Sequence, residues 1–201
     1  MPNLTLRGEF VDLVPLSVEH ASLTFAWRQG ARAANLNRSA PSVALQAAWI
    51  ASRPESEFNF VIALKSGLPV GMVSVIGIDT LHRHCEPCRF LIGDDAAVHG
   101  IPAAVEAMKL VYALIFDELK LSRVFGHIAS DNILMMKWQK FLGMKEEGRL
   151  RRHYFINDHF QDKVLFGMLD GEYRVQALPR MNSLIAAGRI RRRATAKQQE
   201  T

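Results

Sequence analysis

The chain has 201 residues, of which 49% are hydrophobic and 22% are charged. This composition supports one buried core and excludes a globally disordered chain. The N-terminus, MPNLTLRGEF, has no basic start followed by an apolar run, and no stretch of the sequence reaches the roughly 20 apolar residues of a membrane helix. We therefore expect a soluble, cytoplasmic protein without a membrane partner.

The formal net charge of +5 lies at the C-terminal end of the chain. From Arg180 onward there are six basic residues and one acidic residue, so residues 1–179 are neutral overall. We expect one domain over residues 1–175 and a flexible basic tail over residues 176–201. Such a tail either contacts RNA, ribosomes or an acidic membrane, or is simply a solvated end. Nucleic acid is not an expected partner, because the body of the chain is neutral.

The first half of the chain predicts a strand, two helices and two more strands. Residues 4–16 have strand character, a helix follows from Ser17 to Trp27, and Ser42 caps a second helix that Pro54 ends. Residues 58–65 and 70–78 are two strands joined by the short turn SGLP. A polar loop, DTLHRHCEP, then leads to a strand over residues 88–92.

The second half begins with a long helix over residues 101–119, in which apolar side chains recur at steps of three and four. A strand over 123–129 and a helix over 132–142, ended by Gly143, come next. Two final strands, 147–156 and 161–169, flank the turn signal Asn157-Asp158. This order predicts an α/β fold with helices on the faces of a mixed sheet.

Three segments carry a family resemblance: VHGIPAAVEAMKLVYALIFDELKLSRVF, SDNILMMKWQKFLGMKEEGRL and HYFINDHFQDKVLFGML. They resemble the GNAT (Gcn5-related N-acetyltransferase) superfamily, and especially the branch that acetylates ribosomal-protein N-termini and nucleotide-linked amino sugars. The resemblance implies a mostly antiparallel sheet with splayed central strands, and transfer of an acetyl group from acetyl-CoA directly to a primary amine in a ternary complex. Family members are often dimers, so a homodimer stays open.

The resemblance also implies a binding site for the donor. Phe90, Leu91 and Ile92 would lie on the strand whose backbone meets pantetheine and the thioester. The phosphate-loop pattern Q/R-x-x-G-x-G/A aligns with residues 99–104. The amides at this helix start would bind the pyrophosphate. Asn132 occupies the place of an asparagine that contacts CoA, and it is also a good helix N-cap. The loop residues expected to bind CoA are His99, Gly100, Ile101, Ala103 and Ala104.

Some positions depart from the family pattern, and the first is His99, which replaces the usual arginine or glutamine. Pro102 replaces the first glycine and has no N–H, and one lost hydrogen bond to a phosphate costs about 1.5–3 kcal/mol. Proline is also favoured in the first turn of a helix, so it is compatible with retained CoA binding. Gln139 stands where many members have a tyrosine that protonates the thiolate, and Tyr154 is a substitute candidate.

A base must deprotonate the attacking amine. Many members of the superfamily use a glutamate on the strand before the phosphate loop, where this chain has Arg89. Glu86, His84 and His82 are the nearby alternatives, unless they form only a solvated polar loop. The catalytic candidates are therefore Glu86, His84 and Tyr154.

The segment from His82 to Cys88 holds two histidines and a C-x-x-C, but no second ligand cluster completes a zinc site, so we predict no metal. His20, His127 and His153 receive no role. Four aromatic residues either line an acceptor pocket or pack in the core: Trp27, Trp49, Phe58 and Phe60. Two alternatives to an acetyltransferase stay open. One is a degenerate member that senses CoA or acts as a scaffold, and the other is an enzyme with a different acyl donor.

Overall fold

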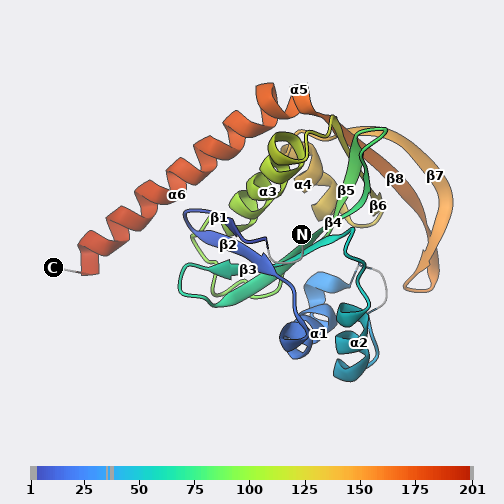
Figure 1. Ribbon diagram of the computed structural model, residues 1–201, viewed down its shortest axis with the longest axis horizontal. Coiled ribbons are helices and arrows are strands. Elements are labelled where there is room, and N and C mark those ends of the chain that lie inside the picture. Colours follow the sequence, from blue (N-terminus) through green and yellow to red (C-terminus); the bar gives the residue numbers. More distant parts are fainter. Residues whose placement is uncertain (1–3, 35, 37–38, 200–201) are drawn as a thin grey trace.

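The computed structural model describes residues 4–34, 36 and 39–199, with side chains as far as residue 191. The described residues form an eight-stranded sheet in the order β1-β2-β3-β4-β5-β6-β8-β7 (Figure 1). All neighbouring strands are antiparallel except β5 and β6, which are parallel. The expected α/β fold with a mostly antiparallel sheet is confirmed.

The strands are β1 (Leu6–Arg7), β2 (Val11–Pro15), β3 (Phe58–Leu64), β4 (Pro69–Asp79), β5 (His84–Ile92), β6 (Arg123–Ala129), β7 (Lys145–Ile156) and β8 (His159–Leu169). The longer helices are α1 (Ala21–Gln29), α2 (Val43–Ala51), α3 (Ala103–Ala113), α4 (Ile133–Phe141) and α6 (Leu178–Gln199). The short turns of helix are η1 (Val18–His20), η2 (Ala31–Ala33), η3 (Leu114–Glu118), α5 (Asp170–Glu172) and η4 (Tyr173–Ala177).

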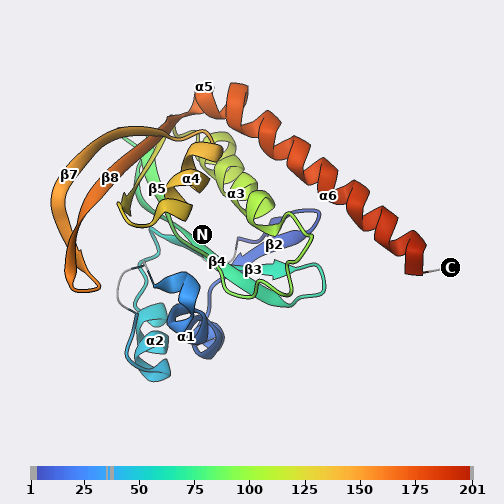
Figure 2. The ribbon, with the colours of Figure 1, turned by 180° about the vertical axis from the view of Figure 1, so that it is seen from behind.

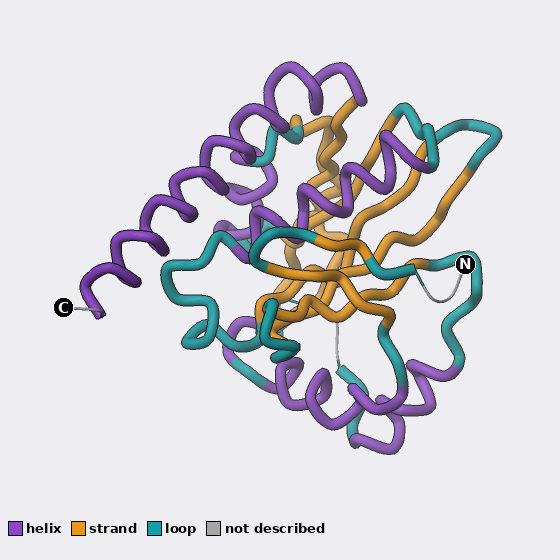
Figure 3. The backbone as a smooth tube through the Cα atoms, turned by 60° about the vertical axis from the view of Figure 1, so that its left-hand side comes forward, coloured by secondary structure: helices purple, strands orange, loops and turns teal. Residues whose placement is uncertain are grey.

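Helices cover both faces of the sheet (Figure 3). On one face, α3 contributes Met108 and Val111 to the main core, together with Val73 and Val75 of β4. On the other face, α1 places Trp27 in a smaller cluster with residues of β4 and β5. The two clusters together bury the sheet between its helical layers.

The central strands β5 and β6 splay apart. They pair only at His84 with Arg123 and at Cys85 with Val124, although β5 continues to Ile92 and β6 to Ala129. Beyond that short pairing, the facing edges of the two strands have no ladder between them. The splayed strands expected from the family resemblance are confirmed.

A β-bulge interrupts β5 just beyond the splay. Met72 pairs with Leu91 and Ser74 pairs with Cys88, so two residues of β5 lie opposite the single residue between them on β4. Arg89, in the bulge, has a φ of 52°. A bulge of this kind re-aims the side chains next to it, and here it turns Arg89 and Phe90 toward the cleft described below.

Strand β5 begins at His84, four residues earlier than the sequence suggested. The supposed loop is therefore short, and Arg83 closes it with a φ of 58°. Pro87, the last residue of the expected loop, lies inside the strand, where proline is rare. It is tolerated where a strand has an unpaired edge, and β5 has such an edge beyond Cys85. His84 and Glu86 are thus strand residues with fixed directions.

Two other expectations changed in detail. The N-terminal strand is a hairpin, β1 and β2, with Gly8 in its turn. The long helix ends at Ala113 and continues as a π-helical turn. The predicted final hairpin is confirmed, and Asn157 and Asp158 have φ values of 52° and 61°, as a type I′ turn requires.

The C-terminal segment differs from the flexible tail that we expected over residues 176–201. Residues 178–199 form the helix α6, whose far end projects from the body (Figures 1 and 2). Met181 and Ile185 are buried, and Arg189 donates to both carboxylate oxygens of Glu9 at 2.8 and 2.6 Å. The core therefore extends past residue 175, because apolar residues recur along one side of this basic helix.

Among the residues that the structure describes, no helix is both long enough and apolar enough to cross a lipid bilayer.

Candidate active site

A cleft of about 590 Å³ opens where β5 and β6 diverge. Its walls come from seven elements: α1, α2, β4, β5, β6, α4 and β7. Polar side chains at its surface are Arg28, Ser39, Gln46, Glu86, Arg89, His127, Asn132, Gln139 and Tyr154. The splay of the sheet thus brings together residues that lie more than 120 positions apart in the sequence.

Glu86 and His127 face each other across the splay. Glu86 lies on β5 and His127 on β6, and His127 Nδ1 is 3.2 Å from Glu86 Oε1. The Glu86 side chain is only 16% exposed. Glu86 is a predicted catalytic residue, whereas His127 had no predicted role, because nothing in the local sequence links a single histidine on one strand with a glutamate on another.

The surroundings shift the pKa of both groups. Burial raises the pKa of the Glu86 carboxyl, while Lys163 and Arg89 pull it down. Burial lowers the pKa of the His127 imidazole, and the charges of Lys163 and His153 lower it further. His127 is therefore a neutral imidazole at neutral pH, and it offers a lone pair beside a partly desolvated carboxyl group.

Tyr154 lies next to this pair. Its ring stacks on that of His127, with centroids 6.3 Å apart. Burial, and then the charge of Glu86, raise the pKa of the Tyr154 phenol. The hydroxyl therefore keeps its proton at neutral pH and is available as a hydrogen-bond donor. Tyr154 and Glu86, two of the predicted catalytic residues, thus line the same cleft.

The third predicted catalytic residue, His84, is not among the described residues that line the cleft. Its ring packs edge-on against Phe125, its Nε2 is 3.8 Å from Asp79 Oδ2, and its Nδ1 is buried without a hydrogen bond. His82, on the turn before β5, contacts the same aspartate at 3.0 Å. These two histidines form a small polar group with Asp79 at the start of β5.

Two polar residues of the α4 region lie on another wall of the cleft. Asn132 Oδ1 accepts a hydrogen bond from Met135 N at 3.2 Å, which makes it the N-cap of α4. Gln139 has a buried Oε1 with no hydrogen-bond partner among the described residues. An unsatisfied acceptor of this kind has an energetic cost unless a ligand or water donates to it.

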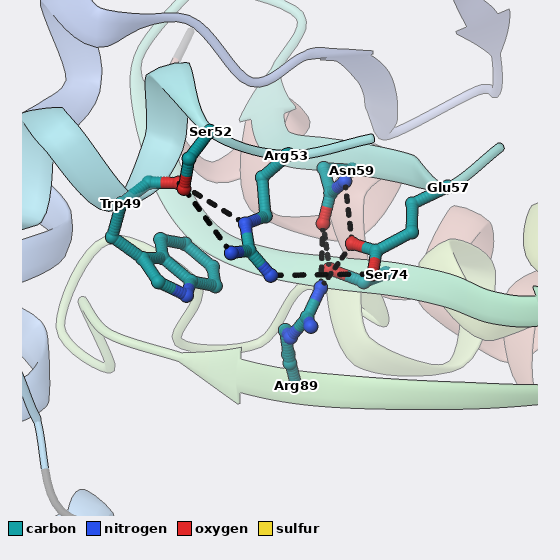
Figure 4. A network of polar contacts seen from close by, with 7 residues as sticks. All are labelled: Trp49, Ser52, Arg53, Glu57, Asn59, Ser74 and Arg89. Carbon is teal, nitrogen blue, oxygen red and sulfur yellow. Dashed lines mark hydrogen bonds and ion pairs between the residues drawn. The ribbon is translucent and has the colours of Figure 1, made fainter. Parts of the chain in front are cut away.

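Arg89 and Trp49 line the cleft on its other side. Arg89 Nη1 donates to Glu57 Oε2 at 2.7 Å and to Asn59 Oδ1 at 2.9 Å, and its guanidinium lies 5.1 Å from the Trp49 ring centre. Figure 4 shows this network, with Arg53 stacked on the same tryptophan. Arg28, at the end of α1, is a second guanidinium in the cleft lining.

The predicted phosphate loop lies at the start of α3, outside the residues that line this cleft. Gly100 has a φ of 74°, a conformation that suits glycine, and a Cβ there would meet no atom within 4 Å. Pro102 is the N-cap, and no side chain caps the helix. The first amides of a helix have no intrahelical partner, so binding of an anion at this loop stays a prediction that the proline does not contradict.

The Pro102 ring packs against α6. A Cβ built on Gly188 would lie 2.7 Å from Pro102 Cδ and Cγ. Helix α6 therefore fits only because residue 188 has no side chain. The proline that replaces the family glycine is part of the packing between α6 and the head of α3.

The other residues predicted to bind the acyl donor lie between the bulge in β5 and the first turn of α3. Phe90 lines the cleft and stacks on Trp138, whereas Leu91 and Ile92 are buried on opposite faces of the sheet. Ala103 is fully buried, and the remaining loop residues surround the helix start: His99, Ile101 and Ala104. Contacts of all these residues with CoA stay predictions.

The two cysteines of the supposed metal motif lie in different surroundings. Cys85 is buried in the main core, while Cys88 lines the cleft. Burial raises the pKa of each thiol to about 12, so neither is a ready thiolate ligand. Within the described residues, no group of three or more possible ligands could hold a metal ion.

Four aromatic residues were expected either to line an acceptor pocket or to pack in the core. One of them, Trp49, lines the cleft. Phe60 is in the main core, Phe58 packs against it, and Trp27 fills the smaller cluster on the other face.

A sequence model described as the acetyltransferase (GNAT) domain matches residues 11–145. This range is about two thirds of the chain and contains the bulge, the splayed strands and the phosphate loop. The chain belongs to the GNAT acetyltransferase family.

Curated relatives of this GNAT protein include two spermidine N(1)-acetyltransferases. The one from Vibrio cholerae serotype O1 is 27% identical over 118 residues, which cover 59% of this chain and 66% of that enzyme. The one from Escherichia coli K12 is 26% identical over 119 residues, which cover 59% of this chain and 62% of that enzyme. The matched segment thus spans less than two thirds of the length of these relatives.

Among solved structures, a GCN5-related N-acetyltransferase from Brucella melitensis is similar to this GNAT chain, with a TM-score of 0.76. The two are 23% identical, and the alignment covers 90% of this chain and 85% of that one. At this identity the likeness concerns the fold alone.

Proposed function

We propose that this protein is an N-acetyltransferase that moves an acetyl group from acetyl-CoA to a primary amine by direct attack in a ternary complex. The observation that carries the proposal is the partly desolvated Glu86 beside His127, in the splay between β5 and β6. Family membership supports acetyl-CoA as the donor.

The chain has features suited to holding this donor. The unpaired edges of β5 and β6 offer backbone donors and acceptors to an extended pantetheine arm. The amides at the head of α3 suit the pyrophosphate, because they and the helix dipole favour an anion. The Pro102 ring lies against α6. It therefore does not point into the proposed pyrophosphate site, which favours retained binding of acetyl-CoA.

Glu86 accepts a proton from the incoming ammonium group, and the neutral His127, with Nδ1 3.2 Å from Glu86 Oε1, is placed to accept a hydrogen bond from the carboxylic acid that forms. The free amine then attacks the thioester carbon, the carbon–sulfur bond breaks, and the nitrogen gives up its second proton, which passes through water to the departing CoA thiolate to leave the acetylated amine and CoA thiol. A base placed this way contributes about 10²–10⁴-fold to the rate. Backbone N–H groups at the bulge would stabilise the negative charge on the carbonyl oxygen.

Tyr154 assists departure of the thiolate by hydrogen bonding. A thiol such as that of CoA has a pKa of about 8.5, well below that of a phenol, so complete proton transfer from Tyr154 is uphill. Because the thiolate is already a fair leaving group, water suffices as the final proton source. This explains how Gln139 can replace a tyrosine without loss of the reaction.

Two measurements test the proposal. Acetyl-CoA at 100 times its dissociation constant should stabilise the fold by about 2.7 kcal/mol, which raises the melting temperature measurably. Thiol release with a panel of primary amines should exceed hydrolysis without amine. A melting shift without acetyl transfer to any amine would support the alternative of a CoA-sensing or scaffold protein. If millimolar acetyl-CoA leaves the melting temperature unchanged, the proposal that acetyl-CoA is the donor is refuted as well.

A further inference from the structure

The charged lining of the cleft is unusual for a protein whose relatives are named for spermidine, a polycation. Among the described residues that line the cleft, Glu86 is the one carboxylate, whereas Arg28 and Arg89 are two guanidinium groups. Lys163, just outside the lining, also acts on Glu86 and lowers its pKa. Two guanidinium groups and one carboxylate thus line the cleft, and one of the two, Arg89, is also paired with Glu57, which is not part of the lining.

The two arginines come from separate elements that the fold brings together. Arg28 lies at the end of α1, and Arg89 is carried by the bulge in β5. Burial, followed by the charge of Arg89, lowers the pKa of the Arg28 guanidinium, so the two like charges lie close enough to repel each other in a partly desolvated space. Glu57 offsets part of this repulsion by pairing with Arg89, and an anion bound between the two arginines would lower it further.

Arg89 is held in a fixed orientation. Glu57 and Asn59 both accept from its Nη1, and Trp49 lies against its guanidinium face. These contacts, shown in Figure 4, leave the guanidinium presented to the cleft instead of free to swing into solvent. A fixed arginine fork is the arrangement that best recognises a carboxylate or phosphate.

The spacing between base and arginine suits a small bifunctional acceptor. Glu86 and Arg89 are three residues apart on β5, which is about 10 Å of strand. An amine at Glu86 and an anion at Arg89 would thus belong to one molecule of the size of a dipeptide or an amino-sugar phosphate. A polyamine would instead place a second cation against the arginines, which costs binding energy.

We infer that the acceptor of this enzyme is an amine that also carries an anionic group, a carboxylate or a phosphate, held by Arg28 and Arg89 while its nitrogen faces Glu86. The inference rests on the proposed function, since it assigns the acceptor end of the same cleft. It goes beyond that function by naming a substrate class that differs from the polyamine of the named relatives.

Calorimetry on the full chain saturated with CoA tests the inference with two matched pairs of ligands. One pair is glucosamine 6-phosphate and glucosamine, and the other is glycylglycine and glycylglycinamide. Spermidine is the fifth ligand. We expect the charged member of at least one pair to bind about tenfold or more tightly than its neutral partner, and spermidine to bind weakly. The pair that responds identifies phosphate or carboxylate.

Arg28→Gln should abolish that preference without changing the affinity for CoA. The matched control is Arg32→Gln, which removes an exposed arginine paired with Asp95 outside the cleft lining and should keep the preference. The inference is overturned if neither anionic ligand is preferred, if spermidine binds most tightly, or if Arg28→Gln leaves the preference intact.

Acetyl transfer to the same five ligands separates this inference from the proposed function. An anion preference in binding without transfer to any ligand would refute the transferase and leave the anion site standing. Transfer that is equally fast to neutral amines or to spermidine would leave the transferase standing and refute the anion site.

Discussion

The proposed donor side and the proposed acceptor side of this protein are built in different ways. The donor side uses backbone: the unpaired edges of β5 and β6 and the amides at the head of α3. The acceptor side uses side chains that converge from several elements, including Arg28, Glu86, Arg89, His127 and Tyr154. Backbone features tolerate sequence change, whereas a converging set of side chains sets specificity. The two sides should therefore respond differently to single substitutions.

The largest expected effect is on the acceptor side. Glu86→Gln removes the base but keeps the size of the side chain, so kcat should fall about a hundredfold or more, while the affinity for acetyl-CoA stays unchanged. Steady-state kinetics and a melting curve with acetyl-CoA measure the two quantities.

Glu118→Gln, at an exposed position, is the charge-matched control and should retain full activity. A loss of less than about threefold for Glu86→Gln would assign the base elsewhere.

The donor side should respond through affinity instead. Gly188→Ala would place a Cβ 2.7 Å from two atoms of the Pro102 ring and push the phosphate loop out of position. We expect acetyl-CoA to bind about tenfold more weakly, which is a change of about 1.4 kcal/mol, with little change in kcat at saturation. Alanine favours a helix more than glycine does, so a loss cannot come from helix propensity.

Two controls accompany this change. Gly171→Ala meets no neighbouring atom and should leave the affinity for acetyl-CoA unchanged. Adding Pro102→Ala to Gly188→Ala removes the clashing ring atoms and restores an N–H, so it should recover the affinity. Failure of this rescue would contradict the role given to the packing at Gly188.

A smaller effect is expected for Tyr154→Phe, which keeps the stacking on His127 and removes the hydroxyl. If the phenol only donates a hydrogen bond to the leaving sulfur, kcat should fall about two- to tenfold. A loss near a thousandfold would instead make Tyr154 an essential acid. Acetyl donors with different leaving thiols, each tested with the same amine acceptor, would locate the effect at the sulfur.

The most subtle effect is a change of pH profile. Lys163 lowers the pKa of both Glu86 and His127. Lys163→Met should therefore raise both pKa values, and the pH at which kcat/KM rises should move upward. The unchanged protein and the Lys163→Met variant are measured with the same acceptor, so that the titration of the acceptor affects both profiles equally. Lys137→Met, at an exposed position, is the control. An unchanged profile would mean that neither group limits the reaction.

The same contrast explains what the sequence could predict. Gly100 and Asn132 carry local signals, a turn glycine and a helix cap, and the structure places both at those points. His127 is a lone histidine on a strand, and only the pairing of β5 with β6 brings it to Glu86. Arg89 reaches the cleft through a bulge in β5 that no single residue in the sequence marks.

The C-terminal helix was missed for another reason. Apolar or small residues at 178, 181, 185 and 188 form a helical stripe, but the run of arginines after them suggested a solvated tail. The helical spacing of these residues could be seen in the sequence, but the basic residues after them favoured the interpretation as a tail. Strand β5 is also longer than expected, since Pro87, the last residue of the expected loop, lies in a strand whose edge is unpaired.

The contact between Gly188 and Pro102 has a practical consequence for handling the protein. The brace that supports the head of α3 comes from residues far beyond the segment 11–145 that matches the family. A shortened chain that stops before residue 188 would lack this contact between α6 and the head of α3. A weaker affinity of such a chain for acetyl-CoA would therefore not report the affinity of the intact enzyme. A fusion tag belongs after the projecting end of α6, where the helix has left the body (Figure 2).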